Sequence, residues 1–264
     1  MNILKNVYYS GKRRALTMSY DDGTIHDRRL AEIFDKYGIR GSFHLNSGNL
    51  GKENRITAEE LPTLFANHEI SLHSLTPPSL EFCSKETIIA QIMQDRANLE
   101  RAAGYVVRGM SYPNGSYNAE VIEILRACGV VCNRTVAATH NFKLPTDFLA
   151  WHPTCHHRDN SLELLDTFLK RDRYLLDCLF VWGHSYEFDR QNNWELIEEF
   201  CKRAAGDETI WYATNIEIYD YVQALKALQC SADGHILHNP CAIDVWVTAD
   251  GQIVKVGAGE TVIL

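Results

Sequence analysis

The feature that most constrains the fold is an alternation of short apolar runs with longer segments in which apolar residues recur at helical spacing. A short apolar run predicts a strand, and apolar residues three or four positions apart predict an amphipathic helix. This alternation occurs seven times before about residue 228. The predicted strands are residues 15–20, 41–45, 70–73, 106–112, 130–133, 177–183 and 209–212. The predicted helices are residues 27–37, 57–67, 85–103, 118–128, 161–170, 193–204 and 215–228.

Strict alternation of strands and helices predicts a parallel sheet with helices outside it. Seven units fit an irregular (β/α)7 barrel better than an open, doubly wound sheet, and we predict this barrel over residues 1–230. Residues 231–264 differ, because they hold short β-rich runs, two of them joined by the hairpin signal Asp250-Gly251. We therefore predict a small C-terminal β-rich appendage, which could serve as a dimer contact or as a lid over the barrel edge.

Composition narrows the classes of partner. The chain has 264 residues and a formal net charge of -8, which argues against nucleic acid or an anionic membrane as the main partner. No apolar stretch reaches the roughly 18 residues that a membrane span needs. The basic residues near the N-terminus are not followed by an apolar block, so no signal peptide is predicted and a cytoplasmic protein is expected. The eight cysteines form no C-x-x-C pair, which predicts reduced, structural thiols.

Polar side chains follow several of the predicted strands. Asp21 and Asp22 come after the first strand, His73 after the third, Asn114 after the fourth and His184 after the sixth. Barrels of this type carry their chemistry at the ends of the strands. Consecutive side chains on an extended backbone point in opposite directions, so the two aspartates could take different roles. The pattern therefore predicts a site at one rim of the barrel.

Each of these positions also has a simpler interpretation. Asp21 and Asp22 stand before Gly23, and Asp-Asp-Gly is good turn chemistry. His73 could be a satisfied core histidine or a metal ligand, and His184 could be a capping histidine or a general acid.

A second histidine group, His152, His156 and His157, lies in the loop-rich stretch after the fifth strand. The spacing of His152 and His156 would suit a metal on a helix, but Pro153 disfavours a helix there. Loop structure or a substrate wall is the simpler interpretation. Cys155 stands beside two of these histidines, so its role stays open.

In this order, five short blocks between about residues 13 and 228 resemble the polysaccharide deacetylase family, the NodB-homology carbohydrate esterases of family four. Residues 17–23, TMSYDDG, are similar to the family's T-F-D-D-G block, and residues 68–74, HEISLHS, to H-E-[IV]-x-x-H-[ST]. Residues 110–115 resemble R-x-P-x-G, and residues 179–184 resemble an apolar strand ending in L-x-H. The fourth block, at residues 151–157, matches poorly. The resemblance implies an irregular (β/α) barrel that removes acetyl groups from sugars with one divalent metal.

The resemblance also implies roles for particular residues. Asp21 would be the general base, Asp22 and His73 would be metal ligands, and His184 would be the general acid that protonates the departing nitrogen. The backbone around Asn114 would help to hold the oxyanion. The aromatic side chains at the rim that could line the substrate site are Tyr112, Trp151 and Trp182.

Two positions depart from the family pattern. The family's second ligand histidine falls on Pro77, which cannot bind a metal, and its arginine falls on Ser111, which leaves Asp21 without its usual partner. Two ligands should hold the metal, zinc or another transition metal, only weakly, because catalytic zinc normally has three protein ligands. The candidates for a third ligand are Glu81, His156, His157 and a water molecule.

Three hypotheses follow. The first is a metal-dependent hydrolase that removes an acetyl group from a small or oligomeric N-acetylated or O-acetylated sugar. The second is a carbohydrate-binding pseudoenzyme with a degraded metal site, which Pro77 and Ser111 motivate. The third keeps the barrel and the hydrolysis but acts on a small amide that is not a sugar. The substrate, the metal and the state of oligomerisation are left open by the sequence.

Overall fold

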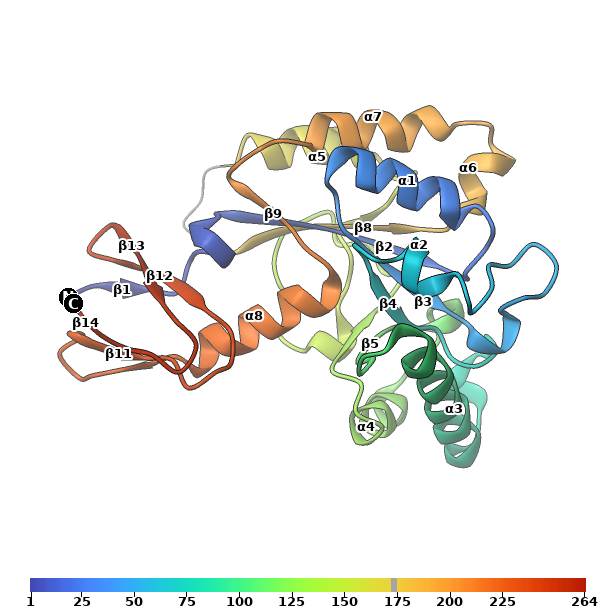
Figure 1. Ribbon diagram of the computed structural model, residues 1–264, viewed down its shortest axis with the longest axis horizontal. Helices are drawn as coiled ribbons and strands as arrows, with labels where there is room; N and C mark the ends of the chain where they lie inside the picture. The colour runs from blue at the N-terminus through green and yellow to red at the C-terminus, as the bar shows by residue number, and fades with distance from the viewer. Residues whose placement is uncertain (172–174) are drawn as a thin grey trace.

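The computed structural model describes residues 1–171 and 175–264. Its centre is a curled parallel sheet with strand order β6-β5-β4-β3-β2-β8-β7, and β9 also pairs with β2 (Figure 1). The strands are β2 (Arg14–Asp21), β3 (Gly41–Leu45), β4 (Glu69–Leu72), β5 (Gly109–Ser111), β6 (Cys132–Arg134), β7 (Cys155–His156), β8 (Asp177–Gly183) and β9 (Ile210–Tyr212). The predicted irregular α/β barrel is confirmed, and the two-residue strand β7 is an addition that the sequence pattern did not reveal.

Strand β2 is the centre of this sheet. It is buried along its whole length and pairs with β8 from Arg14 to Tyr20. On its other side, its first residues pair with β9 and its last residues, Met18–Asp21, pair with β3. Because all these pairings are parallel, the carboxyl end of β2 comes out in the middle of one rim, flanked by β3 and β8.

Eight helices connect and cover the strands among the described residues. They are α1 (Asp27–Tyr37), α2 (Leu61–Leu64), α3 (Lys85–Ala103), α4 (Ala119–Ala127), α5 (Ser161–Leu169), α6 (Tyr186–Arg190), α7 (Trp194–Ala204) and α8 (Asn215–Ala227). Short 3-10 turns are η1 (Tyr9–Gly11), η2 (Ser47–Asn49), η3 (Leu80–Phe82), η4 (Pro113–Gly115) and η5 (Phe148–Ala150). Figure 1 shows α1, α5 and α7 grouped along one side of the sheet, with α3 and α4 along another. In residues 1–171 and 175–264, no helix combines the length and the apolar character that crossing a membrane requires.

The segment at residues 151–157 contacts both edges of the sheet. At one end, the Trp151 N–H donates to the Asn133 carbonyl (3.0 Å) beside β6. At the other end, the Thr154 N–H donates to the Phe180 carbonyl and the His157 N–H to the Trp182 carbonyl (both 2.8 Å) on β8. This segment therefore bridges the gap between the edge strands and delivers two histidines to the rim.

The C-terminal residues form two small antiparallel sheets. One has the order β10 (Gln229–Cys230), β11 (Ile236–His238), β14 (Thr261–Ile263), and the other has β1 (Ile3–Leu4), β12 (Val245–Ala249), β13 (Gln252–Val256). The predicted hairpin at Asp250-Gly251 is confirmed, and both residues have the positive φ, 44° and 85°, that a tight hairpin turn needs. The N-terminal strand β1 joins this appendage, so the two termini lie close together in Figure 1. The division at residue 230 stays a prediction.

Local structure departs from the sequence pattern at a few places. The predicted helix over 57–67 is reduced to α2. In the turn before it, the Thr57 N–H and hydroxyl donate to the Glu60 carboxylate (3.2 and 3.3 Å). The last long helix is capped by Thr214 through a capping box with Glu217. Helix α4 is capped by the Asn118 side chain, which accepts a hydrogen bond from the Val121 N–H (2.9 Å). Strand β6 ends one residue later than predicted, at Arg134.

All eight cysteines are unpaired, as the sequence predicted. Cys155 is completely buried in the core, where burial raises the pKa of its thiol to about 12. A thiol held neutral in this way is a poor metal ligand, so Cys155 is a packing residue.

Candidate active site

Asp21 lies at the end of β2 and forms a buried ion pair with Arg134 at the end of β6. The Arg134 side chain is 1% exposed, and its Nε also donates to the Ser19 hydroxyl (3.0 Å). Its guanidinium carbon lies 4.2 Å from the centre of the Trp182 ring, in cation–π geometry. The family's arginine position, 111, holds a serine in this chain, and an arginine from β6 pairs with Asp21 instead.

This ion pair keeps the Asp21 carboxylate ionised. Burial alone would raise the pKa of Asp21, but the charge of Arg134 outweighs it and holds the pKa well below its usual range. The Ser111 hydroxyl donates to the other oxygen, Oδ1 (2.9 Å). Asp21 is thus fixed in position through both of its oxygens.

His73 follows β4, and its imidazole lies against Ser111. Its Nδ1 is 2.7 Å from the Ser111 hydroxyl oxygen and 3.0 Å from the Ser111 carbonyl oxygen. The one hydroxyl proton of Ser111 is donated to Asp21, so Nδ1 of His73 is the donor toward Ser111 and Nε2 carries the lone pair. That Nε2 is 3.8 Å from Oδ1 of Asp22, which is also an acceptor.

Asp22 follows Asp21 in a left-handed backbone conformation (φ 85°), which turns its carboxylate toward His73. The structure therefore brings together the predicted base Asp21 and the predicted ligand pair Asp22 and His73. Two acceptor atoms that face each other across 3.8 Å suit a cation between them, because zinc bonds of about 2.0–2.2 Å place two ligand atoms roughly 3–4 Å apart. These residues fit the divalent metal that the family pattern implies, with two donors.

His184 follows β8 on the other side of β2. Its Nδ1 lies 3.5 Å from Oε1 of Glu187 in α6. Burial lowers the pKa of His184, but the contact with Glu187 and the charges of Asp21 and Asp22 outweigh burial and raise the pKa above its usual value. A larger share of His184 is therefore protonated near neutral pH than in an ordinary histidine.

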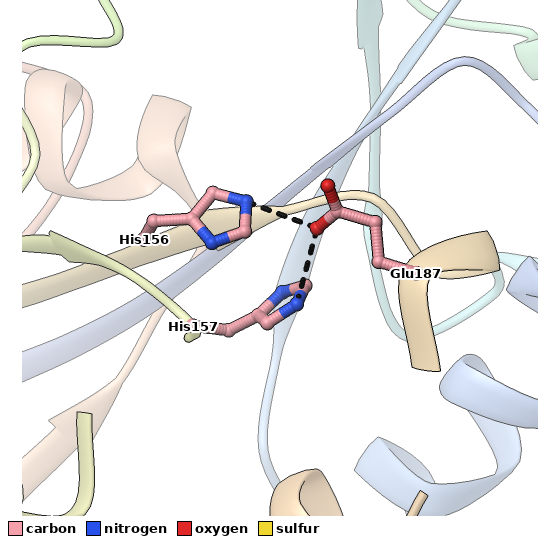
Figure 2. A group of neighbouring side chains, drawn as sticks. All are labelled: His156, His157 and Glu187. Carbon is pink, nitrogen blue, oxygen red and sulfur yellow. Dashed lines mark ion pairs between the residues drawn. The ribbon is translucent and has the colours of Figure 1, made fainter. Parts of the chain in front are cut away.

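Glu187 also lies next to His156 and His157, as Figure 2 shows. Its Oε2 is 3.0 Å from Nε2 of His156 and 3.2 Å from Nε2 of His157. These three side chains form the one group of at least three potential ligands whose donor atoms all lie within 4.8 Å in the part of the chain that the structure describes. The group combines His156 and His157, the suggested replacement ligands, but with Glu187 rather than with Asp22 and His73.

A buried carboxyl group joins the loops after β2 and β8. Asp27, at the start of α1, accepts a hydrogen bond from the Ser185 hydroxyl, which lies 2.9 Å from the Thr24 hydroxyl. Burial raises the pKa of Asp27 to about 8, and the nearby charges of Asp22 and Asp21 add to the shift although the Ser185 hydrogen bond opposes it. This link positions the residue directly after His184.

The remaining predicted residues differ in their access to the rim. Tyr112 and Trp151 are 1% and 2% exposed; the Tyr112 hydroxyl donates to the Leu149 carbonyl (2.8 Å), and Trp151 packs on Phe180 (ring centres 4.5 Å apart). Both are packing residues in this structure. Trp182 is partly exposed between Arg134 and the His156 ring.

Two further candidates lie in the loops around Pro77. Asn114 is exposed in a left-handed conformation, and its side-chain amide donates to the Pro77 carbonyl (3.2 Å). Glu81 is exposed in η3, and its backbone N–H donates to the Ser116 hydroxyl (3.1 Å). Asn114 therefore holds the loop in which the family's second ligand histidine is replaced.

Arg134 and Glu187 were not among the predicted site residues, although each has a signal in the sequence. Arg134 is a charged residue directly after a predicted strand, like the other candidates. Glu187 stands three residues after His184, which is the spacing of neighbours on one helical turn.

Comparison with known proteins relates part of the chain to a known family. The profile of the polysaccharide deacetylase family matches residues 9–132, which hold Asp21, Asp22, His73 and Ser111. Over these residues the chain is similar to the polysaccharide deacetylase family. A search among curated proteins finds none that matches the chain.

Solved structures show the same fold. A Mycobacterium smegmatis protein described as a polysaccharide deacetylase has 17% identity over 85% of this chain and 96% of its own, with a TM-score of 0.63. The Xyl-CE4 domain of a xylanase from the hindgut metagenome of Trinervitermes trinervoides has 15% identity to this chain. The match covers 80% of this chain and 92% of that domain, with a TM-score of 0.53. The match to a Streptococcus pyogenes deacetylase solved with acetate has 16% identity and a TM-score of 0.48 over 51% of this chain, and it spans only 61% of that protein.

Proposed function

We propose that this chain is a metal-dependent hydrolase that removes an acetyl group from an N-acetylated or O-acetylated sugar. The observation that carries the proposal is the buried Arg134–Asp21 ion pair, which restores a charged partner to the family's base position by a different route. A binding protein without activity would have no need for a buried ionised carboxylate at this position, because burying a charge is costly.

The base and the acid of the hydrolysis come from two neighbouring strands, β2 and β8. Asp21 accepts a proton from the attacking water, while Arg134 and Ser111 hold its carboxylate in place. His184 donates a proton to the departing nitrogen or oxygen, as its raised pKa favours. Trp182 offers a partly exposed aromatic face to the sugar.

Asp22 and His73 would hold the divalent metal. A metal ion there supplies a Lewis acid that polarises the acyl carbonyl and favours ionisation of water. Ser111 orients His73 from behind through Nδ1, which is the usual arrangement for a ligand histidine.

The test is acetate release from a panel of N-acetylated and O-acetylated mono- and oligosaccharides by the metal-loaded protein. Asp21→Asn is expected to lower kcat by at least about 100-fold, which is typical for loss of a general base. The matched control is Asp166→Asn, an aspartate on the outer face of α5 that should leave activity unchanged. His184→Gln leaves the buried Arg134–Asp21 ion pair intact, so it serves as the second variant if Asp21→Asn fails to fold. Equal activity of wild type, Asp21→Asn and His184→Gln would refute the proposal.

One observation favours a second candidate function, that of a carbohydrate-binding relative without activity. Pro77 stands at the family's second ligand position, and its loop is held by Asn114. Sugar binding that persists in metal-free protein, without acetate release from any substrate, would support this function. Small acylated amines in the same panel would reveal the third option, an amide substrate that is not a sugar.

A further inference from the structure

We propose that His156, His157 and Glu187 form a site for a divalent transition-metal ion, separate from the Asp22–His73 pair. This inference does not rest on the proposed hydrolase activity, because it concerns metal binding alone. The three side chains come from β7, from the residue after it, and from α6 (Figure 2).

The spacing of the donor atoms matches a metal site. The Glu187 Oε2 atom is 3.0 Å from Nε2 of His156 and 3.2 Å from Nε2 of His157. Metal–ligand bonds of about 2.0–2.2 Å in tetrahedral geometry place ligand atoms roughly 3.3 Å apart. Only small side-chain rotations are therefore needed to place an ion between the three donors.

Buried polar atoms in this group lack hydrogen bonds. His157 is 2% exposed. Among the described residues, neither of its ring nitrogens has a hydrogen-bond partner, and Oε2 of Glu187 has none either. The nitrogen-to-oxygen contacts of 3.0 and 3.2 Å are ion pairs. A buried imidazole without a hydrogen bond is costly, and a bound cation would satisfy both His157 and Glu187.

The group is held rigidly. The His157 ring stacks on Phe188 (ring centres 4.2 Å apart) and on Tyr20 (5.8 Å). A Cβ atom at Gly183 would lie 1.9 Å from Nδ1 of His157, so the absence of a side chain at Gly183 makes room for this imidazole. The His156 ring meets Trp182 edge to face (4.7 Å). Packing that fixes the donors before the ion arrives favours tight binding.

The two oxygens of Glu187 face different groups. Oε1 lies 3.5 Å from Nδ1 of His184 and 3.4 Å from the guanidinium of Arg158, whose side chain is 48% exposed and free to turn into solvent. Oε2 faces only His156 and His157 among these groups. Two imidazoles and one carboxylate are a common ligand set for zinc and also for iron(II), with the remaining positions open to water.

The test is calorimetric titration of the metal-stripped full-length protein with Zn²⁺. The double variant His156→Ala/Glu187→Gln is expected to lower the affinity of one site by about 100-fold or more, since two of three ligands are removed. The double variant Asp22→Asn/His73→Ala should retain that site. His152→Ala, a more exposed histidine on the same segment, is the matched control and should bind like wild type.

Unchanged binding in the His156/Glu187 variant, or loss of all binding in the Asp22/His73 variant alone, would overturn the proposal. Gly183→Ala provides a second variant, because its new Cβ displaces His157 without removing a ligand, and it should weaken the same site. Gly41→Ala is its control, since a Cβ there meets the Phe34 ring at 2.9 Å and touches no proposed ligand. Zinc binding lost equally in both glycine variants would count against the site.

Discussion

Two clusters of acidic and imidazole groups share one rim of the sheet, and they differ in how they relate to the family pattern. The first, Asp21, Asp22 and His73, occupies the family's positions at the ends of β2 and β4 but offers a metal only two donors. The second, His156, His157 and Glu187, offers three donors but belongs to no family block that the sequence matches well. Short sequence blocks therefore identify the first cluster, and only the folded chain identifies the second.

The two clusters also differ in their counter-charges. The Asp21 carboxylate has a permanent partner, Arg134, which is 1% exposed. The Glu187 carboxylate has the imidazoles of His156, His157 and His184, and Arg158 near the surface. A fixed charge suits a base that must stay ionised, whereas two imidazole donors close to one carboxylate oxygen suit a metal.

Of the substitutions that test this difference between the clusters, Arg134→Gln is expected to change the free energy of unfolding most. It leaves the Asp21 carboxylate buried without its counter-charge, which should lower the free energy of unfolding by about 3–5 kcal/mol. It should also raise the pKa of Asp21, since burial then acts with less opposition, and so lower activity at neutral pH. Denaturant unfolding and acetate release measure the two effects.

The control for Arg134→Gln is Arg108→Gln, which breaks the exposed Arg108–Asp220 ion pair and should cost only about 0–1 kcal/mol. In the double variant Arg134→Gln/Asp21→Asn the stability should partly recover, because no buried charge is left alone. A double variant as unstable as the sum of the two single variants would show that Arg134 and Asp21 act independently.

Most of the fold and the first cluster could be predicted from the sequence because they depend on local patterns. Strand and helix periodicity gave the barrel, and a block of seven residues placed Asp21 and Asp22 after β2. Arg134 was missed because its partner is 113 positions away, a distance that no local pattern encodes. Glu187 lies outside the predicted helices, and its contact with His156 depends on the path of the segment at 151–157.

Asp27 provides a smaller test, because it links the loops that carry the two clusters. Its pKa is raised from 3.8 to about 8, so between those values the folded protein holds a proton that the unfolded chain has lost. Asp27 therefore costs stability increasingly as pH rises from about 4 to 8. Asp27→Asn keeps the acceptor for Ser185 and removes this cost, with an expected gain of about 1–3 kcal/mol at pH 8 and less at pH 5.

Thermal unfolding at pH 5 and pH 8 measures this difference, with Asp166→Asn as an exposed control that should change little at either pH. A gain from Asp27→Asn that is equal at both pH values, or larger at pH 5, would contradict the assigned protonation of Asp27. Zinc binding at either cluster should be unchanged, since Asp27 contacts Ser185 and not a proposed ligand.

Pro77→His tests directly whether the first cluster lacks only a ligand. The substitution restores the family's second histidine four residues after His73, while the backbone carbonyl that accepts from Asn114 is retained. A third donor beside Asp22 and His73 should raise zinc affinity at that site at least about tenfold, or about 1.4 kcal/mol.

Ser79→His, which adds a histidine to the same loop at a different position, is the control and should not raise the affinity. If Pro77→His strengthens zinc binding only when His156 and Glu187 are intact, the two clusters are not separate sites, and the contrast between them must be replaced by a single shared centre.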